Sequence, residues 1–278
     1  MVQQKAVSTN GITEGVIWKQ LLIFFFPILF GTLFQQLYNT ADAIIVGRFV
    51  GKEALAAVGG SASVLINLLV NLFVGLSSTT TVAQAYGAQD YEEVGRTVHT
   101  SVMLALTAGA AMTLVGLLCA PAALRAMDTP AETMADSIVY LRVYLLGIVA
   151  SFLYNIGSAV LRAVGDTRRP LYFLIAACLL NILLDLALVL GLGLGVFGVA
   201  LATLLSQIFS ALLVLVTLLR SDWPLRLNRK ELRFTASSLK GILRVGIPAG
   251  LQADMYAISN VILQSCINAF GTVTIAAW

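Results

Sequence analysis

Apolar residues follow one another in long runs along most of this chain, with short polar segments between them. Six complete runs lie at about residues 18–46, 54–82, 97–120, 134–160, 170–191 and 196–219, and a seventh begins near Leu239 and continues to Trp278. Each is close to, or longer than, the roughly 20 residues that an α-helix needs to cross a bilayer. No strand-like alternation accompanies the runs, so the pattern predicts an all-α, polytopic membrane helix bundle.

Composition agrees with a membrane protein. The 278 residues are 59% hydrophobic and only 11% charged, whereas about 25% charge is usual in a soluble domain. The net charge of +3 is small and gives no reason to expect a nucleic-acid partner. We expect the lipid bilayer to be the main surroundings of the chain.

Basic residues are distributed unequally between the two ends of the runs. With the N-terminus inside, 13 of the 17 Lys and Arg residues fall in cytoplasmic segments, whereas only Arg48, Lys52 and Arg125 fall in outer loops. The remaining one, Arg142, lies within the fourth run. By the positive-inside rule, we predict a multi-pass protein of the cell (inner) membrane with a cytoplasmic N-terminus.

The first and seventh runs resemble each other. Pro27 and Asn39 in the first stand at the same spacing as Pro248 and Asn260 in the seventh, and both runs cross from inside to outside. Duplicated bundles are common in secondary transporters. We therefore predict a six-helix N-terminal lobe at 1–219, a basic cytoplasmic linker at 220–238, and the first helix of a second, repeated lobe at 239–278. The rest of that C-terminal lobe is the expected partner on the same chain.

Acidic residues inside apolar runs mark candidate chemistry, because a carboxylate is costly in a spanning helix. Asp42, Asp185 and Thr203 lie at a similar depth, about 7–11 Å below the outer ends of the first, fifth and sixth runs. Asn181 shares a helix face with Asp185, and Tyr38 shares one with Asp42, since residues i and i+4 are neighbours. Hard oxygen ligands suit H⁺ or Na⁺, and two nearby carboxylates hold one proton tightly. A cation site is expected if these runs adjoin.

Two alternatives to a cation site are open. Each aspartate could cap a helix end or pair with a basic residue, for which Arg142 is the nearest candidate. An intramembrane aspartyl protease would also place two aspartates on neighbouring spans. That chemistry expects a Tyr-Asp pair and a Gly-x-Gly-Asp stretch, but Asp42 follows Ala41 and Asp185 follows Leu184. The chain is therefore not expected to be an enzyme.

Asn155 followed by Gly157 predicts a kink in the fourth run.

Five motifs together resemble one known family: YNTADAIIVGRFVGKEALAAVG, VAQAYGAQD, LRAVGDTRRP, NILLD and GVALAT occur in this order. The sequence resembles the multidrug and toxic compound extrusion (MATE) family of cation-coupled efflux transporters. The resemblance implies a two-lobed, twelve-helix antiporter whose N-terminal lobe binds the coupling cation. The family's ligands match Asp42, Asn181, Asp185 and Thr203, with Tyr38 and Tyr140 as supporting residues. Some members also use an acid in the seventh span, but the spacing of Asp254 differs, so that role is not carried over.

The resemblance also implies a function. An amphipathic, usually cationic organic compound or drug would be exported in exchange for H⁺ or Na⁺, with no cofactor besides the coupling ion. A lipid-linked oligosaccharide flippase of related architecture is the alternative, and basic residues lining the central cavity would favour it.

Overall fold

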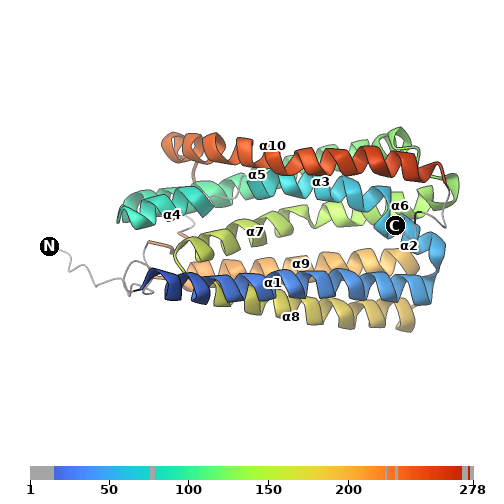
Figure 1. Ribbon diagram of the computed structural model, residues 1–278, viewed down its shortest axis with the longest axis horizontal. Helices are drawn as coiled ribbons and strands as arrows, with labels where there is room; N and C mark the ends of the chain where they lie inside the picture. Colours follow the sequence, from blue (N-terminus) through green and yellow to red (C-terminus); the bar gives the residue numbers. More distant parts are fainter. Residues whose placement is uncertain (1–15, 76–78, 223, 229–230, 271–274, 276–278) are drawn as a thin grey trace.

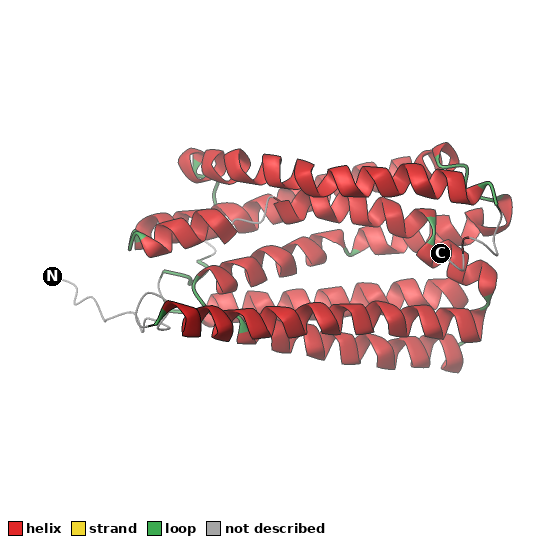
Figure 2. Ribbon diagram, in the orientation of Figure 1, coloured by secondary structure: helices red, strands yellow, loops and turns green. Residues whose placement is uncertain are grey.

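The computed structural model describes residues 16–75, 79–222, 224–228, 231–270 and 275, and within these ranges the regular structure is entirely helical (Figures 1 and 2). The elements are α1 (Ile17–Ile45), the π-helix η1 (Val46–Val50), α2 (Lys52–Gly59), α3 (Ser61–Gly75), α4 (Thr79–Gly87), α5 (Tyr91–Ala126), α6 (Ala131–Leu146), α7 (Ile148–Ala163), α8 (Arg168–Asp185), the π-helix η2 (Leu186–Gly191), α9 (Gly195–Arg220) and α10 (Ala236–Asn268). The all-α prediction is confirmed.

Several of these helices are long and apolar enough to cross a membrane. Five helical stretches meet that description, and the bent pair α6–α7 makes a sixth when it is counted as one span. In Figure 1 the long helices run side by side along the long axis of the molecule. The helix of the seventh run, α10, is continuous through Pro248 but is not among these stretches.

Two of the predicted runs are interrupted where the sequence analysis expected continuity or a different break. The run at 54–82 forms α2, α3 and the start of α4. Gly60 lies at the break between α2 and α3, and a Cβ added there would come within 2.9 Å of Ile275 Cγ2, so only glycine leaves room for that side chain. The fourth run bends by 49° between α6 and α7, at Gly147. The predicted kink at Asn155 and Gly157 is therefore wrong, because α7 is continuous through both residues.

The glycines of α5 and α7 lie where two helices approach each other closely. A Cβ on Gly147 would stand 3.0 Å from Leu204 Cδ1, and a Cβ on Gly157 would collide with Val214, so both glycines let α7 approach α9. On the other side of α7, a Cβ on Gly109 of α5 would lie 3.1 Å from Val149 Cα. Small residues that permit close approach are typical of helix interfaces in membranes, where lipid removes most of the hydrophobic driving force.

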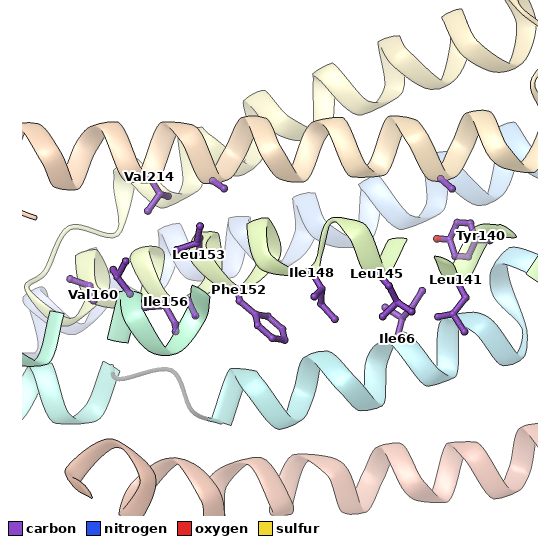
Figure 3. Packing of buried hydrophobic residues seen from close by; sticks show 14 of the residues in the cluster. Ile66, Tyr140, Leu141, Leu145, Ile148, Phe152, Leu153, Ile156, Val160 and Val214 are labelled. Carbon is purple, nitrogen blue, oxygen red and sulfur yellow. The ribbon is translucent and has the colours of Figure 1, made fainter. Parts of the chain in front are cut away.

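The core of the lobe is built around α6 and α7. Figure 3 shows Phe152, Ile156 and Val160 of α7 among the buried side chains between neighbouring helices. By contrast, no residue in the apolar window of α1 is buried, and its large side chains point outward. This is expected of a helix whose surface faces lipid or a further part of the protein.

The packing order of the helices decides where the candidate site lies. α1 packs against α8, α8 against α9, and α6 also against α9, whereas α10 packs chiefly against α3. In Figure 1, α1, α8 and α9 accordingly lie together on the side of the bundle away from α10. The condition set by the sequence, that the first, fifth and sixth runs adjoin, is met.

The linker after α9 packs along the first turns of α5. The Asn228 N–H donates to His99 Nε2 at 3.0 Å, and the other ring nitrogen lies 2.7 Å from the Gly95 carbonyl. Because Nε2 accepts, Nδ1 must carry the proton and donate to that carbonyl. Two more bonds join the segments, from Thr235 N–H to Thr100 Oγ1 at 3.2 Å and from Ser238 Oγ to Glu93 Oε1 at 2.8 Å. The linker and the start of α5 therefore share one end of the bundle.

The charge bias predicts that this end faces the cytoplasm. Ser237 lies there, one residue from the bond to Glu93, and Ala126 ends α5 at the opposite end. Both side chains are exposed. In a background without the native cysteines, we expect a membrane-impermeant maleimide added from outside to label Ala126→Cys and to spare Ser237→Cys. The reverse labelling pattern in intact cells would refute the orientation, and labelling after lysis controls for the reactivity of both positions.

Candidate functional site

The polar residues selected by depth come together between three helices. Asp42 projects from α1, Asn181 and Asp185 from α8, and Thr203 from α9, and all four are buried in this lobe. Their helices are neighbours, and the i, i+4 spacing of Asn181 and Asp185 stacks the amide one turn from the carboxylate. The sequence argument placed these residues correctly relative to one another.

The centre of the cluster is a pair of facing carboxyl groups. The side chains of Asp42 and Asp185 lie within hydrogen-bonding reach of each other. Within the described residues, no donor reaches Asp42 Oδ1 or either carboxylate oxygen of Asp185, and the amide of Asn181 is also unpaired at both of its polar atoms. Buried polar atoms are rarely left unsatisfied, because each costs about 1–3 kcal/mol and charged atoms cost more. A proton or another cation shared between these oxygens would remove that cost.

Both aspartates lie where an α-helix widens into a π-helix. Asp185 is the last residue of α8 and directly precedes η2, and Asp42 stands four residues before η1. The two π-helices contact each other. A π-helix adds a residue per turn and changes the direction of the following side chains, and such segments are frequent at functional sites. The sequence analysis missed them, because neither VGRFV nor LALVLG contains a residue that marks the wider turn.

Hydroxyl groups border the pair on one side. The Tyr38 hydroxyl donates to Thr203 Oγ1 at 3.4 Å, and Thr203 in turn donates to the Val199 carbonyl at 3.1 Å. The free lone pairs of these oxygens remain acceptors, which is the property that a cation ligand requires.

Two tyrosines of α6 complete the surroundings of the pair. Tyr140 is buried and close enough to both aspartates to interact with them electrostatically. Tyr144, one turn further along α6, has its ring centroid 6.3 Å from that of Tyr140. The sequence analysis named Tyr140 through the family resemblance but did not name Tyr144, although the same i, i+4 rule would have found it.

A basic partner for the aspartates is not found in the part of the chain that the structure describes. Arg142 is exposed on α6, and the ion pairs there involve neither Asp42 nor Asp185. Both helices continue into π-helices beyond the aspartates, so neither carboxylate caps a helix end. The alternative of a structural ion pair is therefore not supported.

Asp254 is buried on α10, the helix that packs chiefly against α3. It does not belong to the cluster.

The donor set indicates what the cluster can bind. It offers two carboxylates with neutral oxygen atoms around them, and no group of three or more His, Cys, Asp or Glu side chains suited to a metal ion occurs among the described residues. A transition-metal site would use such imidazole, thiolate or carboxylate groups. A single H⁺ or a hydrated or partly dehydrated Na⁺ fits the available charge and ligands better.

Comparison with known proteins finds relatives among multidrug transporters. The family model MatE matches residues 27–187. A probable multidrug resistance protein of Bacillus subtilis, YoeA, is 29% identical over 99% of this chain and 61% of its own length. The multidrug export protein MepA of Staphylococcus aureus is 26% identical over 95% of this chain and 59% of its own. The chain thus spans about three fifths of the length of these relatives.

Solved structures share the fold. The inward-facing structure of a multidrug resistance MATE family transporter of the MOP superfamily superimposes with a TM-score of 0.80 at 32% identity, covering 87% of this chain and 56% of that one. A MOP superfamily transporter from Pyrococcus furiosus, described as having a binding pocket of reverse polarity, gives a TM-score of 0.84 at 30% identity, covering 92% and 57%. These proteins are transporters and not enzymes.

The unsatisfied carboxyl pair leads to a prediction about stability. Asp185→Asn keeps the size of the side chain, removes one buried charge and supplies an N–H that can donate to Asp42. We therefore expect the melting temperature of the purified chain to stay unchanged or to rise by a few degrees. A gain of 1 kcal/mol in the free energy of unfolding corresponds to roughly 2–4 °C. Thermal unfolding in detergent at alkaline pH and low Na⁺ measures this. Asp222→Asn, an exposed position in the linker, is the control and should change nothing. A clear fall in the melting temperature of Asp185→Asn alone would show that the carboxylate stabilises the fold.

Proposed function

Because the chain belongs to the MatE family of membrane transporters, we propose that it is the cation-binding lobe of a secondary active antiporter that exports amphipathic, usually cationic organic compounds. The coupling ion is H⁺ or Na⁺, bound by Asp42, Asn181, Asp185 and Thr203, with Tyr38 and Tyr140 in support. The single observation that carries this proposal is the buried Asp42–Asp185 pair, three of whose carboxyl oxygens have no hydrogen-bond partner among the described residues. No further cofactor is needed for this function.

The chemistry of the pair provides a means of coupling. With no cation bound, two facing carboxylates repel each other and retain a negative potential that attracts a cationic substrate. A proton on one carboxyl, or Na⁺ between both, removes the repulsion and most of that attraction. Substrate and coupling ion then compete, and competition for one charged site is sufficient to exchange them across the membrane when access alternates.

The helices around the carboxyl pair differ in how firmly they are packed. Thr203 lies on α9, which packs against α6, α7 and α8, whereas Asp42 lies on α1, which has no buried residue in its apolar window and contacts mainly α8. Asp185 lies on α8 between these two helices, so a change of charge at the pair acts on the contact between a peripheral helix and its neighbour. We propose that the second lobe, for which α10 is the first helix, completes the substrate pathway with α1 and α3.

The intramembrane protease alternative has no support from the family. A membrane transporter accounts for the facing aspartates without a hydrolytic step, and the protease motifs are absent from the sequence.

The transport proposal is tested in the full-length protein that carries both lobes. We expect Asp185→Asn to lower efflux driven by an H⁺ or Na⁺ gradient at least about tenfold, since neither carboxylate alone can exchange the ion. Asp42→Asn should do the same, and the double variant should lose little more, because groups that act as a unit are not additive. Thr203→Ala should be milder, as it removes one neutral ligand.

Efflux of a fluorescent drug from proteoliposomes with matched protein amounts is the measurement. Asp222→Asn is the charge-neutralised control and should transport normally. Near-normal, gradient-dependent efflux by Asp185→Asn would mean that the carboxylate does not carry the coupling ion.

A further inference from the structure

A separate cavity lies between α1, α7 and α8, nearer the linker end of the bundle than the carboxyl pair. Its volume is about 250 Å³, and Pro27, Ile28, Leu171 and Leu174 supply apolar walls. The polar lining includes Gln35 and Gln36 of α1 and Asn155 of α7. Along α1, Gln36 precedes Asp42 by about 9 Å at 1.5 Å per residue. The cavity is therefore a neighbour of the cation site on the same helices, but not part of it.

One residue gives this cavity a positive charge. Arg162, in the last turn of α7, lines it, and no Asp or Glu is among the described residues that do so. The sequence analysis assigned Arg162 to the cytoplasmic segment between two spans and looked to Arg142 as the basic residue of the spans. In the structure Arg142 is exposed on α6, whereas Arg162 is only partly exposed.

The guanidinium of Arg162 has no anionic partner within the described residues. The basic residues at the start of α8 are different: Arg169 pairs with Asp166 at 3.2 Å, and the same carboxylate accepts from the Arg169 backbone N–H. Arg168 and Arg169 are both exposed. Arg162 has neither an ion pair of this kind nor a hydrogen bond to the described chain, although an unpaired and partly desolvated charge is costly. An external anion would remove that cost.

We infer that this cavity binds the phosphate or carboxylate group of an amphipathic molecule, with Arg162 as its charge partner. A guanidinium presents a planar fork of donors that matches both anions in a bidentate manner. The amides of Gln35 and Asn155 can donate further bonds to the same group, and the leucine and proline walls contact the apolar part. The volume lies near the lower end of small-molecule sites, so it suits a head group with the first part of a chain.

The binding step does not depend on the proposed antiport. Only the further statement that the bound molecule is cargo rests on the proposed function, and it then narrows the substrate class to compounds that carry an anionic group, alone or beside a cationic one. A purely cationic compound would be repelled by Arg162 and would have to bind at the carboxyl pair instead.

The test uses the purified 278-residue chain in phosphatidylcholine nanodiscs, with dansyl-labelled undecanoic acid and its methyl ester as probes. Dansyl emission reports binding, and empty nanodiscs correct for partition into lipid. We expect the chain to bind the acid about tenfold or more tightly than the ester. Arg162→Gln should reduce the affinity for the acid to that for the ester, and Arg162→Lys should give an intermediate value, since it keeps the charge but loses the bidentate fork.

Two further variants separate charge from folding. Arg142→Gln removes an exposed basic residue of α6 and should bind both probes like the unmodified chain. Gly31→Leu fills the cavity, because a Cβ there would stand 3.9 Å from the side chains of Leu171 and Leu174, and it should weaken both probes without a change of charge. Equal affinity of the unmodified chain for acid and ester, or an Arg162→Gln or Arg162→Lys chain with undiminished preference for the acid, overturns the inference.

Competition identifies the source of the anion. If phosphatidylglycerol in the nanodisc displaces the acid probe and added decyl phosphate does not displace it further, the natural ligand is a membrane lipid head group, as a flippase would require. If decyl phosphate competes and phosphatidylglycerol does not, the ligand is a water-soluble amphipathic anion. These results are independent of the Asp185→Asn experiment, because loss of coupling leaves anion binding intact and loss of anion binding leaves the carboxyl pair intact.

Discussion

The repulsion between two carboxyl groups that face each other inside an apolar bundle is the constraint on which the rest of this structure depends. Asp42 Oδ1 and both carboxyl oxygens of Asp185 have no hydrogen-bond partner among the described residues, and we propose that a shared cation satisfies them. The surrounding oxygens of Tyr38 and Thr203 accept without adding charge. On the proposed function, a single monovalent ion decides whether the contact between α1 and α8 is attractive or repulsive.

The helices of the lobe differ in how firmly they are packed around the carboxyl pair. Close approach at Gly147 and Gly157 fixes α7 against α9, and the buried side chains of α7 hold the centre of the bundle. In contrast, α1 lies at the periphery and contacts chiefly α8. Asp42 therefore lies on the least buried helix of the lobe, and Asp185 lies on α8, which connects that helix to α9 and the packed centre.

Much of the fold and of the candidate site could be predicted from the sequence, for reasons that are specific to membrane helices. Long apolar runs predict spans, and Asp42, Asp185 and Thr203 could be assigned a common depth because the rise per residue of an α-helix is constant. What failed depends on contacts between helices. The chain bends at Gly147, where a Cβ would meet Leu204, and Gly157 lies against Val214 of α9. That Arg162 lines a cavity between three helices likewise depends on contacts that the sequence does not show. The π-helices after Asp42 and Asp185 leave no trace in an apolar sequence.

Infrared difference spectroscopy of the purified chain tests the central claim, a shared cation on the Asp42–Asp185 pair, most directly. Protonated carboxyl groups absorb separately from carboxylates, so titration with alkali or with Na⁺ can be followed for buried groups. The account predicts that the unmodified chain loses the absorption of one buried protonated carboxyl as the pH rises, that Na⁺ produces the same loss if it binds there, and that Asp42→Asn and Asp185→Asn each alter this same signal. A spectrum that is identical in the unmodified chain and in the double variant would contradict it.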